Sequence, residues 1–139
     1  MVNGRLNWCL EAHNILVIEQ AGFRANRSTN QHVAKLLQCI KDLLGQRKVL
    51  NAVFIDLKSA YDTVWKEKLI LKLSNYGICF KMLKWFQSFL STRSCRVKYG
   101  SSFSKKVKLQ AGLPQGAVTS CSLFNIYVND LVKSIKSVE

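Results

Sequence analysis

The chain has 139 residues, which suits one domain and is too short for two ordinary ones. Its 48% hydrophobic and 10% aromatic residues exclude an intrinsically disordered chain. Its longest apolar runs are only a few residues, and the first twenty residues lack the basic and apolar segments of a signal peptide. We therefore expect a single intracellular domain over 1–139, with no membrane span.

The charge is strongly positive and unevenly distributed. Twenty-one Lys and Arg residues against eight Asp and Glu residues give a net charge of +13. Ten basic residues and no acidic one lie between Lys68 and Asn129. Such a field attracts polyanions, with nucleic acid the commonest and an acidic membrane surface second, although basic residues can also serve solubility alone.

The five cysteines form no CxxC pair, and both histidines lie far from them in the sequence. This spacing favours buried thiols over a zinc site or a disulfide framework.

The first half of the chain predicts two helices and one strand. Residues 6–17 have a modest helical periodicity, and a clearer helix begins after Ser28, Thr29 or Asn30 and ends near Gly45. Residues 49–57 are β-branched and apolar at both odd and even positions, which predicts a strand covered on both faces.

The second half predicts two helices, a hairpin and a final helix. Helices are expected from about 69 to Gly77 and over 80–90, and a last one over 121–135. Between them Cys95, Val97 and Tyr99 alternate with Arg96 and Lys98, and then Val107 and Leu109 alternate with Lys106 and Lys108. This alternation predicts a β-hairpin with one apolar and one basic face. The order favours an α+β fold, with helices packed on a small sheet.

Two loops carry candidate chemistry. Asp56 ends the predicted strand, where a buried carboxylate needs a metal, an arginine or N–H donors, unless it is a turn or cap residue. The small Ala60 lets a ligand approach the backbone beside Tyr61. Asp62 is expected either to complete a capping box with Ser59, three residues before it, or to cap the next helix. The other loop, 112–116, holds the one proline between two glycines; it can approach a flat ligand or serve only as a turn.

Three blocks of residues, taken in this order, form a recognisable set. They are QAGFR (20–24) with RST (27–29), FIDLKSAYDTVW (54–65), and GLPQG (112–116) with LFNIYVND (123–130). Together they resemble the reverse transcriptase domain of non-LTR retrotransposons, the jockey-like elements of arthropods in particular. The resemblance covers nearly the whole chain and implies part of the fingers and palm of a right-hand polymerase.

The resemblance also implies a chemistry. The family copies RNA into DNA with two Mg²⁺ ions held by palm carboxylates, and Asp56 stands where the first catalytic aspartate is expected, with the Leu57 carbonyl as a further metal ligand. Tyr61, beside Ala60, falls where a ring lies under the incoming sugar and excludes a 2′-hydroxyl. Further nucleotide contacts are implied for Gln115, for Gly112 and Gly116 on the template side, and for Arg24 and Arg27 at phosphates.

Some family features are missing from these residues. Ser120-Cys121 stands where the family usually has Ser-Pro, and neither the upstream fingers motifs nor the Tyr-x-Asp-Asp hairpin is present. One aspartate cannot hold two Mg²⁺ ions, so we expect no polymerisation by this chain without the remaining polymerase segments. The implied partners are an RNA template, a DNA primer and deoxynucleoside triphosphates, in the nucleus or cytoplasm.

Two alternatives stay open. Instead of a polymerase segment, the chain is then a non-catalytic module that binds RNA or DNA through its basic hairpin residues Arg96, Lys98, Lys106 and Lys108, or an inactive retrotransposon remnant.

Overall fold

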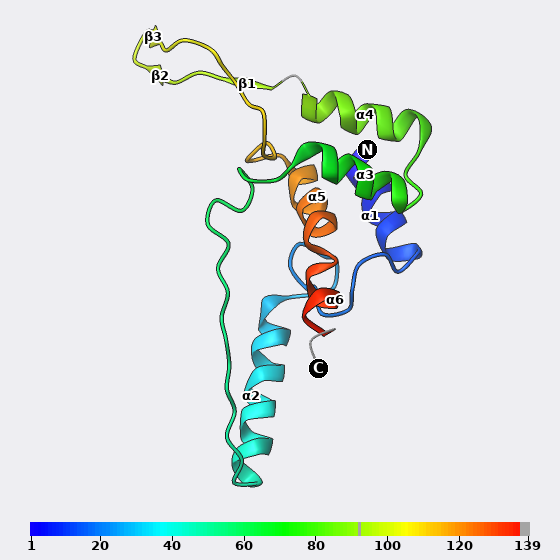
Figure 1. Cartoon of the computed structure of the whole chain (residues 1–139), viewed down its shortest axis with the longest axis vertical. Helices are drawn as coiled ribbons and strands as arrows, with labels where there is room; N and C mark the ends of the chain where they lie inside the picture. The colour runs from blue at the N-terminus through cyan, green and yellow to red at the C-terminus, as the bar shows by residue number, and fades with distance from the viewer. Residues whose placement is uncertain (92, 137–139) are drawn as a thin grey trace.

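A computed structural model describes residues 1–91 and 93–136 of the chain. Figure 1 shows α1, α3, α4 and α5 gathered into one helical body, from which α2 and a narrow arm with the β-strands extend. In chain order the elements are α1 (Val2–Ala12), α2 (Thr29–Gly45), α3 (Lys66–Asn75), α4 (Phe80–Ser91), β1 (Ser94–Cys95), β2 (Lys98–Tyr99), β3 (Ser102–Phe103), β4 (Val107–Lys108), α5 (Val118–Val128) and α6 (Leu131–Lys136).

Helix α5 is the centre of the helical body. It contacts both α1 and α3, and α3 in turn contacts α4. Its Leu123 and Ile126 are fully buried and join Leu6 of α1, Leu69 of α3 and Phe86 of α4 in one apolar cluster. Since α5 is apolar around most of its circumference, it must be covered on several sides, and the neighbouring helices provide that cover.

Polar side chains are also buried along α5 and its C-terminal end. Ser122 donates a hydrogen bond to the side-chain oxygen of Asn7 at 2.6 Å, and Asn125 donates to the Gly22 carbonyl at 2.8 Å. These residues lie three apart and therefore share a face of the helix. Both bonds tie α5 to the first 24 residues of the chain.

Asn129 makes the largest set of these bonds and is only 1% exposed. Its side-chain oxygen accepts from the Val17 amide at 2.9 Å, and its side-chain nitrogen donates to the Ile15 carbonyl at 2.8 Å and to the Tyr76 hydroxyl at 3.1 Å. One side chain therefore joins α5, the segment after α1 and the end of α3.

Several sequence predictions are confirmed. Helix α2 begins after Ser28, whose amide donates to the Gln31 side chain at 3.3 Å, and it ends at Gly45. Helix α3 ends just before Gly77, which has a φ of 81°, and α4 follows as expected. The hairpin also forms, with β1 paired to β4 and β2 paired to β3, both antiparallel.

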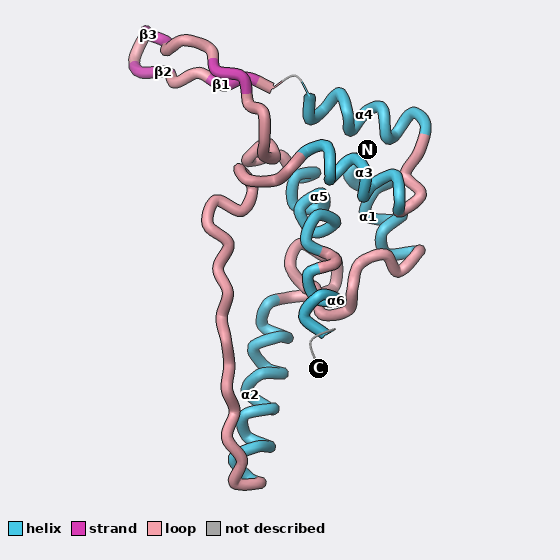
Figure 2. The backbone as a smooth tube through the Cα atoms, in the orientation of Figure 1, coloured by secondary structure: helices cyan, strands magenta, loops and turns pink. Residues whose placement is uncertain are grey.

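The strand predicted over 49–57 is wrong. Figure 2 shows this segment as a long loop beside α2, and its side chains are exposed, with Val53 at 85% and Phe54 at 84%. A strand requires a neighbouring strand for its backbone hydrogen bonds, and none of the paired strands in the described residues lies against this segment. The apolar pattern indicates a segment that favours burial, but it does not show whether a neighbouring strand is present.

Two helix boundaries also differ from the prediction. Helix α1 ends at Ala12 because Asn14 adopts a left-handed φ of 49°, and the Ile15 amide bonds back to the Leu10 carbonyl at 2.9 Å. The last helix is broken at Asn129 and Asp130, where the Asn129 amide bonds to the Ile126 carbonyl instead of continuing the regular pattern. Both breaks fall at Asn or Asp, which are weak helix formers.

The predicted packing of the helices on a small sheet is also wrong. The helices pack on one another, whereas the strands form a separate arm with every strand residue exposed.

Within the described residues, no helix is both long and apolar enough to cross a bilayer.

We expect Asn129→Leu to lower the free energy of unfolding by about 1–3 kcal/mol, because the part-buried Val17 amide loses its acceptor. Urea unfolding of the variant and the parent chain measures the difference. Asn51→Leu, at an exposed loop position, is the matched control and should change it by less than about 0.5 kcal/mol. Equal losses for the two variants would contradict this role for Asn129.

Candidate functional site

Two loops that lie far apart in the sequence are joined through their backbones. The Gly112 amide donates to the Val64 carbonyl at 2.9 Å, and the Leu113 amide donates to the Tyr61 carbonyl at 2.8 Å. Loop 112–116 is thereby fixed against the segment that leads into α3. The second and third sequence blocks therefore meet in one place.

Gly112 is required at this junction for two reasons. Its φ of 89° is in the left-handed region, and a Cβ at this position would lie 2.9 Å from the Asp62 carbonyl oxygen. Gly116, at the other end of the loop, also has a left-handed φ of 80°, but a Cβ there would meet no atom within 4 Å. Only Gly112 allows the two backbones to approach.

A pocket of about 580 Å³ opens between the two loops, a volume typical of ligand-binding sites. Four of the predicted nucleotide-binding residues line it: Ala60, Tyr61, Gln115 and Gly116. Gly112 lies outside the lining but holds the loop that forms one wall.

Tyr61 forms a flat and uncharged part of this pocket. Its ring stacks on Phe124 of α5, with centroids 4.9 Å apart and an interplanar angle of 20°. Burial, together with the neighbouring Cys121 thiol, raises the pKa of Tyr61 to about 12. The phenol therefore stays protonated at neutral pH and can donate a hydrogen bond.

Asp62 belongs to the pocket, and the prediction that it caps the next helix is wrong. The residue before α3 is Trp65, and the Asp62 carboxylate instead accepts a hydrogen bond from the Gln115 side-chain nitrogen at 2.9 Å. This bond orients the amide of Gln115, whose carbonyl oxygen is left for a ligand. The spacing of Asp62 from Ser59 matched a capping motif, and no local signal pointed to a partner 53 residues away.

Asp56 and Leu57 do not reach the pocket in this structure. Both are exposed in the loop that replaces the predicted strand. Within the described ranges 1–91 and 93–136, no group of three or more His, Cys, Asp or Glu side chains could hold a metal ion. A single exposed carboxylate does not fit a pair of Mg²⁺ ions, which need several oxygen ligands each.

Arg24 and Arg27 also lie away from the pocket and bind protein groups. The Arg24 side chain is 5% exposed and forms two hydrogen bonds to the Glu11 carboxylate, at 2.6 and 2.8 Å, which lower the pKa of that carboxyl. Arg27 donates to the Ile18 carbonyl at 2.6 Å. In this structure the two arginines of the first block hold residues 11–27 together through these hydrogen bonds. Phosphate binding by the two arginines stays a prediction.

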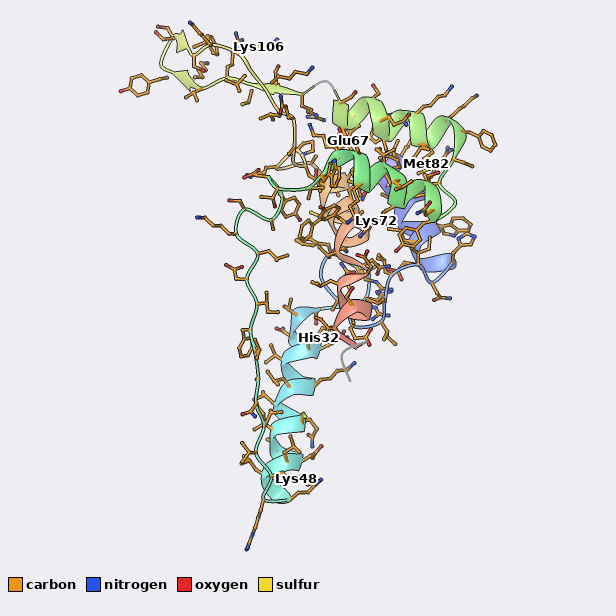
Figure 3. All side chains as sticks on the ribbon, viewed as in Figure 1. His32, Lys48, Glu67, Lys72, Met82 and Lys106 are labelled. Carbon is orange, nitrogen blue, oxygen red and sulfur yellow. The ribbon has the colours of Figure 1, made fainter. Side chains whose placement is uncertain are left out.

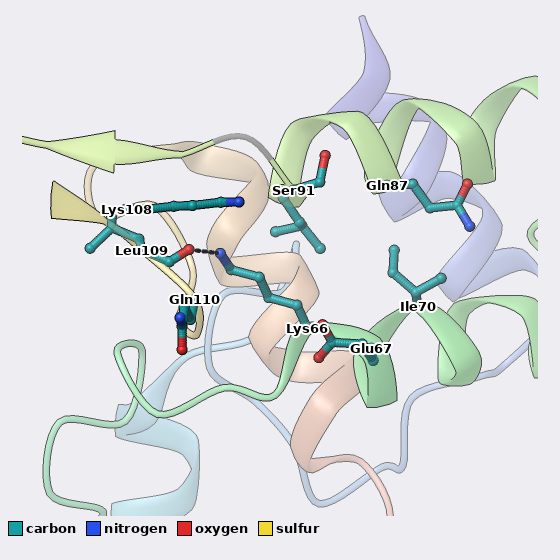
Figure 4. Close-up of a pocket in the computed structure, with 9 residues that line it drawn as sticks. Lys66, Glu67, Ile70, Gln87, Ser91, Lys108, Leu109 and Gln110 are labelled. Atoms are coloured by element: carbon teal, nitrogen blue, oxygen red, sulfur yellow. Dashed lines mark hydrogen bonds between the residues drawn. The ribbon is translucent and has the colours of Figure 1, made fainter. Parts of the chain in front are cut away.

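The arm, residues 93–109, ends at a second pocket of about 590 Å³, which Lys108 and Leu109 help to line. Figure 4 shows the Lys66 amine directed at the arm, where it donates to the Leu109 carbonyl at 2.6 Å. Lys66 is 7% exposed, and this burial lowers its pKa. The bond fixes the base of the arm to α3.

The two ladders confirm the predicted hairpin, whereas one continuous basic face along it stays a prediction. Lys98 pairs with Phe103 near the tip, whereas Ser94 pairs with Lys108 near the base, so residues 104–106 contain one extra residue that forms a bulge. Lys98 is paired with Phe103, whose ring the Arg96 guanidinium covers, and Lys108 is paired with Ser94 in the other ladder. Alternation along the chain predicts that Lys106, which Figure 3 shows out on the arm, joins these cations on one face, which we call the basic face. Cys95, Tyr99 and Val107 occupy the other face.

Comparison with known proteins gives a consistent result for the whole chain. Residues 1–139 match the family described as reverse transcriptase (RNA-dependent DNA polymerase). The chain is 32% identical over 137 residues to the probable RNA-directed DNA polymerase from transposon BS of Drosophila melanogaster, an alignment that covers 94% of this chain and 14% of the relative.

The chain also aligns with a similarly small part of two further relatives. The probable RNA-directed DNA polymerase from transposon X-element of D. melanogaster is 31% identical over 88% of this chain and 13% of its own length. The jockey mobile-element RNA-directed DNA polymerase of Drosophila funebris is 25% identical over 81% of this chain and 12% of its own length. The chain thus spans 12–14% of these relatives. No solved structure gives a significant match.

We expect Gly112→Ala to destabilise the chain more than Gly116→Ala. Both variants place alanine at a left-handed φ, at a cost of about 1–2 kcal/mol, but only the first adds a clash with the Asp62 backbone, worth roughly 1–3 kcal/mol more. Urea unfolding of both variants isolates the second contribution. Equal destabilisation would show that the loops do not approach this closely.

Proposed function

The chain belongs to the reverse transcriptase family of RNA-dependent DNA polymerases, and we propose that it supplies the nucleotide-binding part of a longer retrotransposon polymerase that copies RNA into DNA. The observation that carries this proposal is the pocket between loop 59–62 and residues 115–121, which include the start of α5, with Tyr61 and Gln115 in its wall. In this proposal the chain contributes parts of the fingers and palm of a right-hand polymerase. Its partners are an RNA template, a DNA primer and deoxynucleoside triphosphates.

The pocket offers different contacts to different parts of a nucleotide. The Tyr61 ring, held by its stack on Phe124, is a flat surface for the sugar, and the lack of a bulky side chain at Ala60 leaves room beside it. In this position the ring excludes a sugar that carries a 2′-hydroxyl. Gln115, oriented by Asp62, presents its amide to the nucleotide, and Gly112 and Gly116 shape the adjoining loop where the template base lies.

Asp56 is proposed to act only in the complete protein. There its carboxylate and the Leu57 carbonyl would contribute to a Mg²⁺ site whose other ligands lie outside these residues. Because the described residues contain no group that fits the metal, no catalytic step is assigned to the isolated chain. Magnesium dependence is accordingly a property proposed for the longer polymerase.

A second candidate function, nucleic-acid binding without chemistry, is favoured by one specific observation. The basic residues of the arm are exposed and lie apart from the pocket, as Figure 1 shows for the strands that carry them. The two functions are compatible, because they use different residues.

A titration of isotopically labelled chain with a deoxynucleoside triphosphate tests the pocket. We expect NMR shifts at the amides of 60–62 and 115–117, and we expect Gln115→Ala to weaken binding by at least roughly fivefold, the cost of one hydrogen bond. Gln110→Ala makes the same exposed substitution outside this pocket and should leave the affinity unchanged. Shifts confined to other residues, or equal effects of the two variants, would contradict the assignment.

A primer-extension assay with an RNA template and Mg²⁺ tests whether other segments are required. We expect the 139-residue chain to add no nucleotides, because Asp56 alone cannot bind two metal ions. Incorporation that Asp56→Asn abolishes would show that the isolated chain has a complete catalytic site, against this account.

A further inference from the structure

An aromatic ring lies among the cations on the basic face of the arm. The Arg96 guanidinium lies over the Phe103 ring, 4.0 Å from its centroid, and the Lys98 amine lies 5.7 Å from the same centroid. Phe103 nevertheless remains 50% exposed. The face therefore presents a flat guanidinium and phenyl stack to solvent, flanked by lysines.

The arm itself carries no acid, and Glu67 lies beside its base, where it lines a pocket together with Lys108. The sequence contains no Asp or Glu between Lys68 and Asn129, which includes the whole arm. The ion pairs Arg24–Glu11 and Lys72–Asp130 both lie on the helical body. The arm is therefore a local concentration of positive charge that favours a polyanion.

The base of the arm is fixed while its faces stay open. The Leu109 amide donates to the Arg93 carbonyl at 2.9 Å, Lys66 bonds to the Leu109 carbonyl, and the Arg93 guanidinium lies over Phe89 of α4, 4.5 Å from its centroid. Figure 1 shows the strands projecting beyond the helices. A long ligand can thus lie along the outer part of the arm, and it comes near the helices only at the Lys108 end.

We propose that the basic face of the arm binds single-stranded nucleic acid. Arg96, Lys98, Lys106 and Lys108 contact phosphates, and one base stacks on Phe103 and its guanidinium partner. A single strand fits better than a duplex because its unpaired bases expose flat surfaces for stacking, whereas a duplex hides them within the helix.

The binding surface is separate from the pocket. It shares no residue with the pocket wall at 59–62 and 115–121, so strand binding does not depend on nucleotide binding. The identification of the strand as the RNA template rests on the proposed polymerase function. In that setting the arm holds template outside the nucleotide site.

Fluorescence anisotropy with a labelled single-stranded RNA of 15 or so nucleotides, and with the same strand in a duplex, tests the proposal. We expect tighter binding of the single strand, with an affinity that falls steeply as salt rises. Lys98→Gln should reduce the log–log salt slope by about 0.7, the loss of one phosphate contact on a single strand. Lys48→Gln, at the far end of α2 in Figure 3, is the matched control and should leave the slope unchanged.

Phe103→Leu should weaken single-strand binding at least roughly fivefold and leave duplex binding unchanged, whereas Phe103→Trp should preserve binding. Tyr99→Leu removes an aromatic ring from the opposite face and should have no effect. Circular dichroism of each variant checks that the chain stays folded.

Three results would overturn the proposal: equal effects of Tyr99→Leu and Phe103→Leu, equal or tighter binding of the duplex, or binding to anionic lipid vesicles but not to RNA. The nucleotide titration separates this proposal from the pocket. If the arm binds RNA while the nucleotide causes no shifts at 60–62 and 115–117, the arm assignment stands and the pocket assignment fails.

Discussion

The backbone junction between loop 112–116 and residues 61–64 is the constraint on which the candidate site depends. Two amides, Gly112 and Leu113, donate across it, and the glycine at 112 lets the two backbones approach. Without this junction Tyr61 and Gln115 have no reason to line one pocket, because 53 residues separate Asp62 from Gln115 along the chain. The junction also lies beside Lys66, which fixes the base of the arm. One short contact therefore positions both surfaces that are proposed to bind ligands.

Helix α5 extends this constraint to the rest of the body. It begins just after the loop, stacks Phe124 on Tyr61, and then binds the N-terminal segment through Asn125 and Asn129. The three blocks that resemble a reverse transcriptase thus converge on one helix. Many residues of these blocks have a structural role, because the side chains of Arg24, Asn125 and Asn129 all donate hydrogen bonds to backbone carbonyls within the fold.

Local patterns predicted most of the helices but not the environment of the acids. The capping candidates Ser28, Thr29 and Asn30, of which the structure uses Ser28, and the terminal Gly45 predicted the bounds of α2, because these signals lie at the ends of the helix. The strand prediction over 49–57 was wrong because a strand depends on a partner strand, which the local pattern does not specify. The capping prediction for Asp62 was wrong for a related reason. The hydrogen bond from Gln115 to Asp62 is a tertiary contact, whereas the capping pattern is local. The pocket residues Tyr61 and Gln115 came from the resemblance, which carries such tertiary information.

Amide hydrogen exchange on the 139-residue chain tests the central junction most directly. We expect the Gly112 and Leu113 amides to exchange only through global unfolding, and we expect the same of the Val17 amide because of its bond to Asn129. The amides of Val53 and Phe54, in the exposed loop, should exchange at the rate of an unfolded peptide and serve as the internal reference. Exchange of Gly112 and Leu113 as fast as that reference would contradict the junction, and with it the assembly of the pocket.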